Sequence, residues 1–165
     1  MAMGMFDLIR LLSDNDVDFV LVGGLAVALQ GYPRTTMDVD VVLAMDSENL
    51  TRFVKGAREA GLQPTIPVDI DALRDPALID TWYREKGMLA FSLRGPAAQA
   101  TVIDVLVRPK VSFEALRRDA TLVDVGNCRI PVASIPHLIE MKRDTGRSKD
   151  RIDIEELEKL QEDGR

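Results

Sequence analysis

The chain has 165 residues, with 27 acidic and 21 basic side chains, a formal net charge of −6 and a hydrophobic fraction of 46%. This length suits one domain with a sizeable core, and the acidic balance argues against nucleic-acid binding by bulk electrostatics, although a local basic patch could still bind it. The single cysteine, Cys128, excludes an intramolecular disulfide framework and a multi-cysteine zinc site.

Two further absences in the sequence bear on location. No apolar run approaches the ~20 residues that a membrane span needs. The N-terminus lacks a basic segment followed by an apolar stretch and a small-residue cleavage site, so no signal peptide is predicted. We therefore expect a cytoplasmic protein without a membrane partner.

The first half of the chain is predicted to alternate helices and strands. Apolar residues recur at helical spacing near the N-terminus, short β-rich runs follow, and glycines mark the helix ends. The expected elements are a helix over about 3–13, a strand Phe19–Val22, a helix 25–30 that stops at Gly31, a strand Asp38–Leu43 and a helix capped by Asp46 or Ser47 that ends at Gly61. Residues 62–74 contain two prolines and stay ambiguous.

The second half is predicted to contain two hairpins and several short helices. Asp75-Pro76 starts a helix, strands 88–93 and 101–107 join at Gly95-Pro96, and strands 121–125 and 129–132 join at Gly126-Asn127; helices are expected at 112–119, from Ser134 to about 144, and at 150–161. The order of elements predicts an α+β or mixed α/β fold in a single domain spanning 1–165, with one mixed β-sheet and flanking helices.

Three aspartates lie within apolar strands. Asp38 and Asp40 are two residues apart, so their side chains share one face of the strand, with Cα atoms about 6.6 Å apart. Two such carboxylates would repel each other, and a divalent cation relieves this because it supplies positive charge and takes oxygen ligands. Asp104 lies in a second β-branched run, and if the two strands are neighbours, three carboxylates meet. That set suits two Mg²⁺ ions about 3.5–4 Å apart, although solvent-facing acids on an edge strand remain the alternative.

A double glycine, Gly23-Gly24, lies between a predicted strand and a predicted helix. Helix N-termini present unpaired N–H groups, and glycine lets a phosphate approach the backbone closely. The pair is neither a Walker loop nor a Rossmann fingerprint. A purely structural turn is the alternative, but the aspartates on the next strand favour a phosphate site.

The closing helices carry a possible cationic site. Lys142 lies at the edge of the apolar stripe of its helix, where it either extends into solvent or meets a nucleotide phosphate. Asp150 and Asp153 border the apolar face of the last helix, and a dipole effect at the helix start explains Asp150 equally well. A local basic cluster is formed by Arg143, Arg147, Lys149 and Arg151.

Together these motifs resemble the signature of the nucleotidyltransferase superfamily, which has the polymerase-beta-like fold. The resemblance covers about residues 5–160. Arg34-Thr35-Thr36 ahead of Asp38-Val39-Asp40 is similar to the R-x-T-x-D-h-D form of the minimal bacterial branch. Residues 141–157, MKRDTGRSKDRIDIEEL, resemble the K…R-x-K-D-x-x-D element of the abortive-infection toxin-like nucleotidyltransferases.

The resemblance implies an Mg²⁺-dependent enzyme, with Mn²⁺ as a substitute, that moves a nucleoside monophosphate from a triphosphate to a hydroxyl. The acceptor would be RNA, such as a tRNA 3′ end, or a protein, in a toxin–antitoxin setting with a cognate antitoxin. The catalytic and metal-binding residues would be Asp38, Asp40 and Asp104. The nucleotide-binding residues would be Gly23, Gly24, Arg34, Thr36, Lys142, Lys149 and Asp150.

One position departs from the usual pattern. Many members carry Gly-Ser, whose hydroxyl contacts the phosphates, whereas Gly24 offers only its backbone. The Gly-Gly variant does occur in the toxin-like branch, so it does not argue against activity. Two other functional classes also stay open: a non-catalytic, antitoxin-like binding module that keeps the fold, and a metal-dependent phosphohydrolase that uses the same acids.

Overall fold

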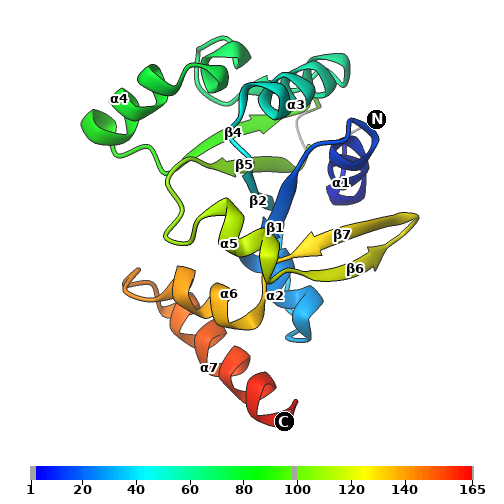
Figure 1. The fold of residues 1–165 in the computed structure, drawn as a ribbon, viewed down its shortest axis with the longest axis vertical. Coiled ribbons are helices and arrows are strands. Elements are labelled where there is room, and N and C mark those ends of the chain that lie inside the picture. The colour runs from blue at the N-terminus through cyan, green and yellow to red at the C-terminus, as the bar shows by residue number, and fades with distance from the viewer. Residues whose placement is uncertain (1–2, 98–99, 165) are drawn as a thin grey trace.

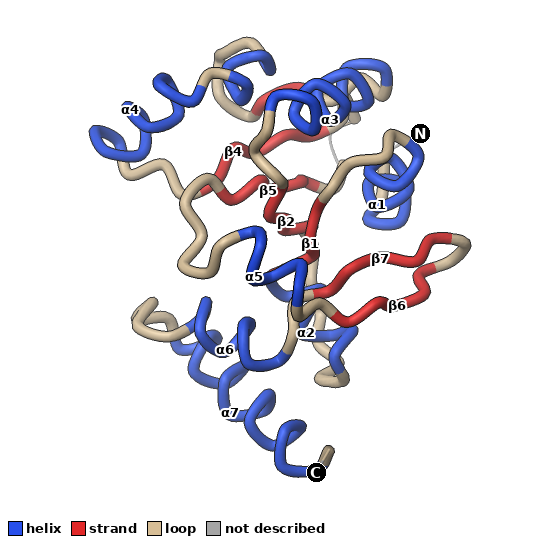
Figure 2. Tube along the Cα trace, in the orientation of Figure 1, coloured by secondary structure: helices blue, strands red, loops and turns tan. Residues whose placement is uncertain are grey.

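A mixed β-sheet forms the centre of the computed structural model, which describes residues 3–97 and 100–164 (Figures 1 and 2). Seven strands of the described chain lie in the order β3-β4-β5-β2-β1-β7-β6. Their bounds are β1 (Phe19–Val22), β2 (Val39–Leu43), β3 (Gln63–Pro64), β4 (Ala90–Arg94), β5 (Val102–Leu106), β6 (Thr121–Val125) and β7 (Cys128–Val132). The predicted α+β fold with a mixed sheet and flanking helices is confirmed.

Four helices begin directly after a capping side chain, whereas the last helix begins at Ser148 rather than at about 150. Side chains of Asp46, Asp75, Ser112 and Ser134 each accept a hydrogen bond from a backbone N–H of the first helical turn. The helices are α1 (Met5–Asp14), α2 (Gly23–Gln30), α3 (Ser47–Glu59), α4 (Pro76–Lys86), α5 (Phe113–Arg118), α6 (Ile135–Lys142) and α7 (Ser148–Asp163), with a 3₁₀ turn η1 at Ile70–Arg74.

Strand register brings the carboxylates together. β2 pairs with β5 in parallel, so Asp40 lies opposite Asp104, and β4 pairs with β5 antiparallel, so Ser92 lies opposite Asp104 from the other side. β1 pairs with β2 antiparallel, with Val22 opposite Asp40. Gly23, the next residue along the chain, therefore starts α2 beside Asp40.

The alternation along β2 and β5 separates the core from the site. Val39, Val41, Ile103 and Val105 are fully buried, whereas Asp40 and Asp104 are only partly buried. Side chains two apart share a face, so the two acids lie on the face opposite these valines and isoleucine. α2 packs against β1, β2 and α6, and α6 packs against α7. Figure 1 shows α6 and α7 together at the end of the molecule opposite α3 and α4.

The structure resolves one region that the sequence left ambiguous and differs from the prediction in another. The ambiguous residues 62–74 form the short edge strand β3 and η1. β2 begins at Val39, so Asp38 precedes the strand that was predicted to contain it. The predicted domain span 1–165 includes residues 1–2, 98–99 and 165, which lie outside the described residues. None of the helices among the described residues is long and apolar enough to cross a membrane.

Candidate functional site

Asp40 and Asp104 form the centre of the candidate site. They occupy paired positions on the neighbouring parallel strands β2 and β5. On the other side of Asp104, the Ser92 hydroxyl on β4 donates a hydrogen bond to Asp104 Oδ1. Three adjacent strands thus present two carboxylates and a hydroxyl in one row. Sequence reasoning named both aspartates but missed Ser92, because a serine in a strand indicates nothing until the register is known.

The close approach of these acids changes the acidity of Asp40. Burial, the charge of Asp104 and a hydrogen bond shared with it raise the pKa of Asp40 from 3.8 to about 7. Asp38 adds to this rise, whereas Lys142 opposes it. A carboxylate pair short of positive charge behaves in this way.

The donor set fits a divalent cation only in part. Asp40 and Asp104 offer carboxylate oxygens, the ligands that Mg²⁺ prefers, and the raised pKa of Asp40 indicates that the pair would gain from a cation. Among residues 3–97 and 100–164, however, no three His, Cys, Asp or Glu side chains are grouped closely enough to hold a metal ion. Of the three predicted carboxylates, only Asp40 and Asp104 occupy paired strand positions, whereas Asp38 precedes β2.

The double glycine is in contact with both sides of the site. Gly23 has φ +72°, and a Cβ there would lie 2.7 Å from Cγ of Asp40. Only glycine allows both this backbone conformation and this approach. At Gly24 a Cβ would meet Thr36 Oγ1 at 3.1 Å and Arg34 Cζ at 3.6 Å. The start of α2 thus lies between the acidic row and the loop that carries Arg34 and Thr36.

A cavity of about 280 Å³ opens over the acidic row. Two cations, Lys142 and Arg147, line it together with the two aspartates. Its lining comprises Val22, Gly23, Asp40, Leu89, Ala90, Asp104, Leu106, Leu138, Met141, Lys142 and Arg147. For Lys142 the sequence left open an extension into solvent or contact with a nucleotide phosphate, and the resemblance implied the latter. Arg147 was noted only as one of a basic cluster, because its place on a turn gave no indication of direction.

Two buried carboxylates of α7 hold these cations. Lys142 Nζ lies 3.3 Å from Asp150 and 3.0 Å from Asp153, which are almost fully buried. Arg147 Nε lies 2.7 Å from Asp150. Asp153 also pairs with Arg34. Although burial acts to raise the pKa of Asp150, hydrogen bonds from Thr145 and Arg147 and the charge of Lys142 together hold it below its usual range.

Not every predicted binding residue reaches the cavity. Asp150 lies behind Lys142 and Arg147, and its oxygens bond to them and to Thr145. Lys149 is exposed in the first turn of α7 and does not line the cavity. Asp153 was considered as a residue bordering the apolar face and as the last aspartate of the D-x-x-D pattern in residues 141–157, without a role of its own. Its partners lie 119 and 11 positions away in the sequence, so local spacing could not reveal it.

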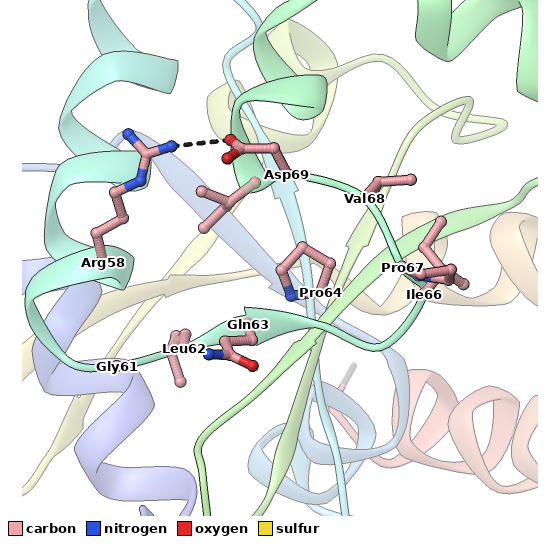
Figure 3. Close-up of a pocket in the computed structure, with 10 residues that line it drawn as sticks. Arg58, Gly61, Leu62, Gln63, Pro64, Ile66, Pro67, Val68 and Asp69 are labelled. Atoms are coloured by element: carbon pink, nitrogen blue, oxygen red, sulfur yellow. Dashed lines mark hydrogen bonds and ion pairs between the residues drawn. The ribbon is translucent and has the colours of Figure 1, made fainter.

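Two further cavities lie near the sheet. One, of about 670 Å³, lies beside the edge strand β3, and Arg58 there pairs with Asp69 at 2.8 Å (Figure 3). It contains no pair of neighbouring strand carboxylates. A cavity of about 540 Å³ adjoins the cavity over the acidic row, because Leu106 lines both cavities. Tyr83 and Phe113 also line the 540 Å³ cavity, and Arg108 Cζ lies 5.6 Å from the centre of the Tyr83 ring.

Comparison with known proteins identifies the architecture. No protein-family model matches the chain, and no curated protein matches it in sequence. Its structure is similar to that of the lincosamide antibiotic adenylyltransferase LnuA in its lincomycin-bound form, with a TM-score of 0.59 and 14% identity over 94% of this chain and 95% of that chain.

Two further solved structures are similar. ANT(2")-Ia in complex with adenylyl-2"-tobramycin matches with a TM-score of 0.55 and 10% identity over 94% of this chain and 91% of that one. An antigenic nucleotidyltransferase-like protein from Paracoccidioides brasiliensis matches with a TM-score of 0.53 and 18% identity over 97% and 78%. At such identities the likeness concerns architecture, and the chain has the fold of the nucleotidyltransferases.

Proposed function

We propose that the chain is a metal-dependent nucleotidyltransferase that moves a nucleoside monophosphate from a triphosphate to a hydroxyl group. The observation that carries this proposal is the pairing of Asp40 with Asp104 under a cavity that Lys142 and Arg147 also line. Acids and cations lining one cavity suit the transfer of a phosphoryl-bearing group, in which catalysis consists of positioning and charge stabilisation.

The acids would hold the metal. Asp40 and Asp104 would supply oxygen ligands to Mg²⁺, with Mn²⁺ as a substitute, and Asp38 would join them when the cation is bound. Bound Mg²⁺ would offset the charge of the phosphates and of the acids. The hydroxyl of Ser92, bonded to Asp104 Oδ1, would fix the orientation of that carboxylate.

The remaining residues would bind the triphosphate and complete the reaction. Phosphate oxygens would accept hydrogen bonds from the backbone N–H groups at Gly23-Gly24, and Lys142 and Arg147 would offset their charge. Asp104 would accept the proton of the acceptor hydroxyl. The acceptor oxygen would then form a bond to the α-phosphorus as the bond to the bridging oxygen breaks, and pyrophosphate would leave.

The proposal also names the molecule that accepts the nucleoside monophosphate. By the resemblance of residues 141–157 to toxin-like enzymes, we propose an RNA or protein hydroxyl, in a toxin–antitoxin setting with a cognate antitoxin. The neighbours solved with lincomycin and with an adenylylated tobramycin make an antibiotic hydroxyl the competing acceptor. We place the acceptor in the adjoining cavity lined by Tyr83 and Phe113, because it shares Leu106 with the acidic row.

The deciding experiment supplies the protein with each of the four α-labelled triphosphates, Mg²⁺, and either total RNA, lysate protein, lincomycin or tobramycin. We expect label on an RNA or protein species, abolished by Asp104→Asn and reduced by Tyr83→Ala at unchanged triphosphate binding. Label on an antibiotic alone would mean that the acceptor is an antibiotic hydroxyl and not an RNA or protein hydroxyl. Phosphate release without a labelled acceptor would indicate a phosphohydrolase, and triphosphate binding with neither product would indicate a binding module.

A further inference from the structure

Three cations around the candidate site share two buried carboxylates. Asp150 bonds to Lys142 and Arg147, and Asp153 bonds to Arg34 and Lys142. The side chains of Asp150 and Asp153 are 2% and 3% exposed. Buried carboxylates are retained only where partners satisfy them, so this arrangement is tightly specified.

Asp153 is the member that joins separate segments. Arg34 comes from the loop between α2 and β2 and lies beside Gly24, whereas Lys142 is the last residue of α6 and lines the cavity. Asp153 itself is on α7 and does not line the cavity. It can therefore act on a ligand there only through the side chains that it holds.

We infer that Asp153 is a positioning residue, which fixes Arg34 beside Gly24 and Lys142 at the cavity so that both meet the phosphates of the nucleotide. This inference rests on the proposed function, because it concerns the site assigned to the triphosphate. Lysine is a point charge on a flexible four-carbon stem, and without a buried partner its head group turns to solvent. Asp153 keeps the Lys142 head group at the cavity wall, at 3.0 Å.

The sign of the effect distinguishes positioning from simple charge. If charge alone mattered, removing the carboxylate of Asp153 would leave the site more positive and would tighten phosphate binding. If positioning matters, the same change weakens binding, because Arg34 and Lys142 lose their common anchor. A hydrogen bond to a charged group typically corresponds to about tenfold or more in an equilibrium constant.

The test measures binding of the four Mg²⁺-triphosphates by calorimetry, using the one that wild type binds best. We expect Asp153→Asn to weaken binding about tenfold or more. Glu156→Gln is the matched control on α7, because it removes a carboxylate whose partner is Lys159, at 3.1 Å; its binding constant should equal that of wild type. Unchanged or tighter binding by Asp153→Asn would overturn the inference.

Two further comparisons separate positioning from general support of the fold. In a Lys142→Ala background, Asp153→Asn should cost clearly less than in wild type, because part of its effect passes through Lys142; an equal cost would refute the inference. If Asp153→Asn does not fold, Asp153→Glu takes its place, since it keeps the charge but moves the carboxylate by one methylene. We then expect about threefold weaker binding, and wild-type binding would refute the inference.

A readout without nucleotide keeps the inference separate from the proposed function. Under native acetylation with acetic anhydride, Asp153→Asn should raise the modification of Lys142 several-fold relative to Lys55, which is exposed on α3. If wild type binds no triphosphate, the proposed function fails while this measurement still decides whether Asp153 holds Lys142. Unaltered reactivity of Lys142 would contradict the inference in either case.

Discussion

The acidity of Asp40 gives a quantitative prediction for Asp40→Asn. Asp40 has a pKa of about 7 in the folded protein against an ordinary value of 3.8. The folded state thus binds this proton more tightly than the unfolded state. The stabilisation is fully present below pH 3.8 and is lost as the pH rises through 7.

The size of the effect follows from that difference. Each pH unit between the two values costs about 1.4 kcal/mol of unfolding free energy, so the full loss is about 4 kcal/mol, of which about 2 kcal/mol falls between pH 5.5 and 7. Asparagine at this position carries no charge and can still donate to Asp104. We therefore expect Asp40→Asn to gain about 2 kcal/mol relative to wild type over this interval, or about 4–8 °C in Tm.

The assay is thermal or denaturant unfolding of wild type and Asp40→Asn at several pH values, without divalent cations. Asp124→Asn is the control, since it removes a carboxylate that is 78% exposed on β6. Parallel stability profiles for wild type and Asp40→Asn would refute the reasoning, because they would mean that Asp40 ionises equally easily in the folded and unfolded states. Mg²⁺ at pH 8 should raise the Tm of wild type, and Asp40→Asn should lose most of that increase.

Three further substitutions test the surroundings of the site. Gly23→Ala should lower the free energy of unfolding by about 1–2 kcal/mol because of backbone strain at φ +72°. It should also abolish transfer, because its Cβ would displace the Asp40 carboxylate. Thermal melting and the labelling assay measure the two effects, and full activity would contradict the prediction. Ser92→Ala should lower transfer about tenfold at nearly unchanged Tm, since it frees Asp104 to rotate; wild-type kcat/KM would contradict it. Asn49→Ala should cost about 3 kcal/mol of unfolding free energy, because the Asn49 side chain bonds to the backbone of Asp18 and Ala44. Urea unfolding measures this cost, and a value below about 1 kcal/mol would contradict the prediction. Transfer per folded molecule should not change.

Local sequence rules predicted most of the elements, because their causes lie within a few residues. Asp46 and Ser134 cap helices through backbone groups three residues on, and Gly31 ends α2 with φ +125°. Residues 62–74 could not be predicted, since β3 exists only through its pairing with β4. The start of β2 at Val39 rather than Asp38 likewise follows from pairing with β1 and β5.

The candidate site likewise has features with local causes and features that depend on the tertiary structure. The sequence by itself determined that acids at positions 38, 40 and 104 lie in or beside apolar strands and that a glycine pair precedes a helix, because strand periodicity and backbone conformation are local properties. Only the tertiary structure decided that Asp40 meets Asp104 and Ser92, that Arg147 faces the cavity and that Asp153 joins Arg34 to Lys142. Those contacts depend on strand register and on the packing of α6 and α7, which bring together residues as many as 119 positions apart.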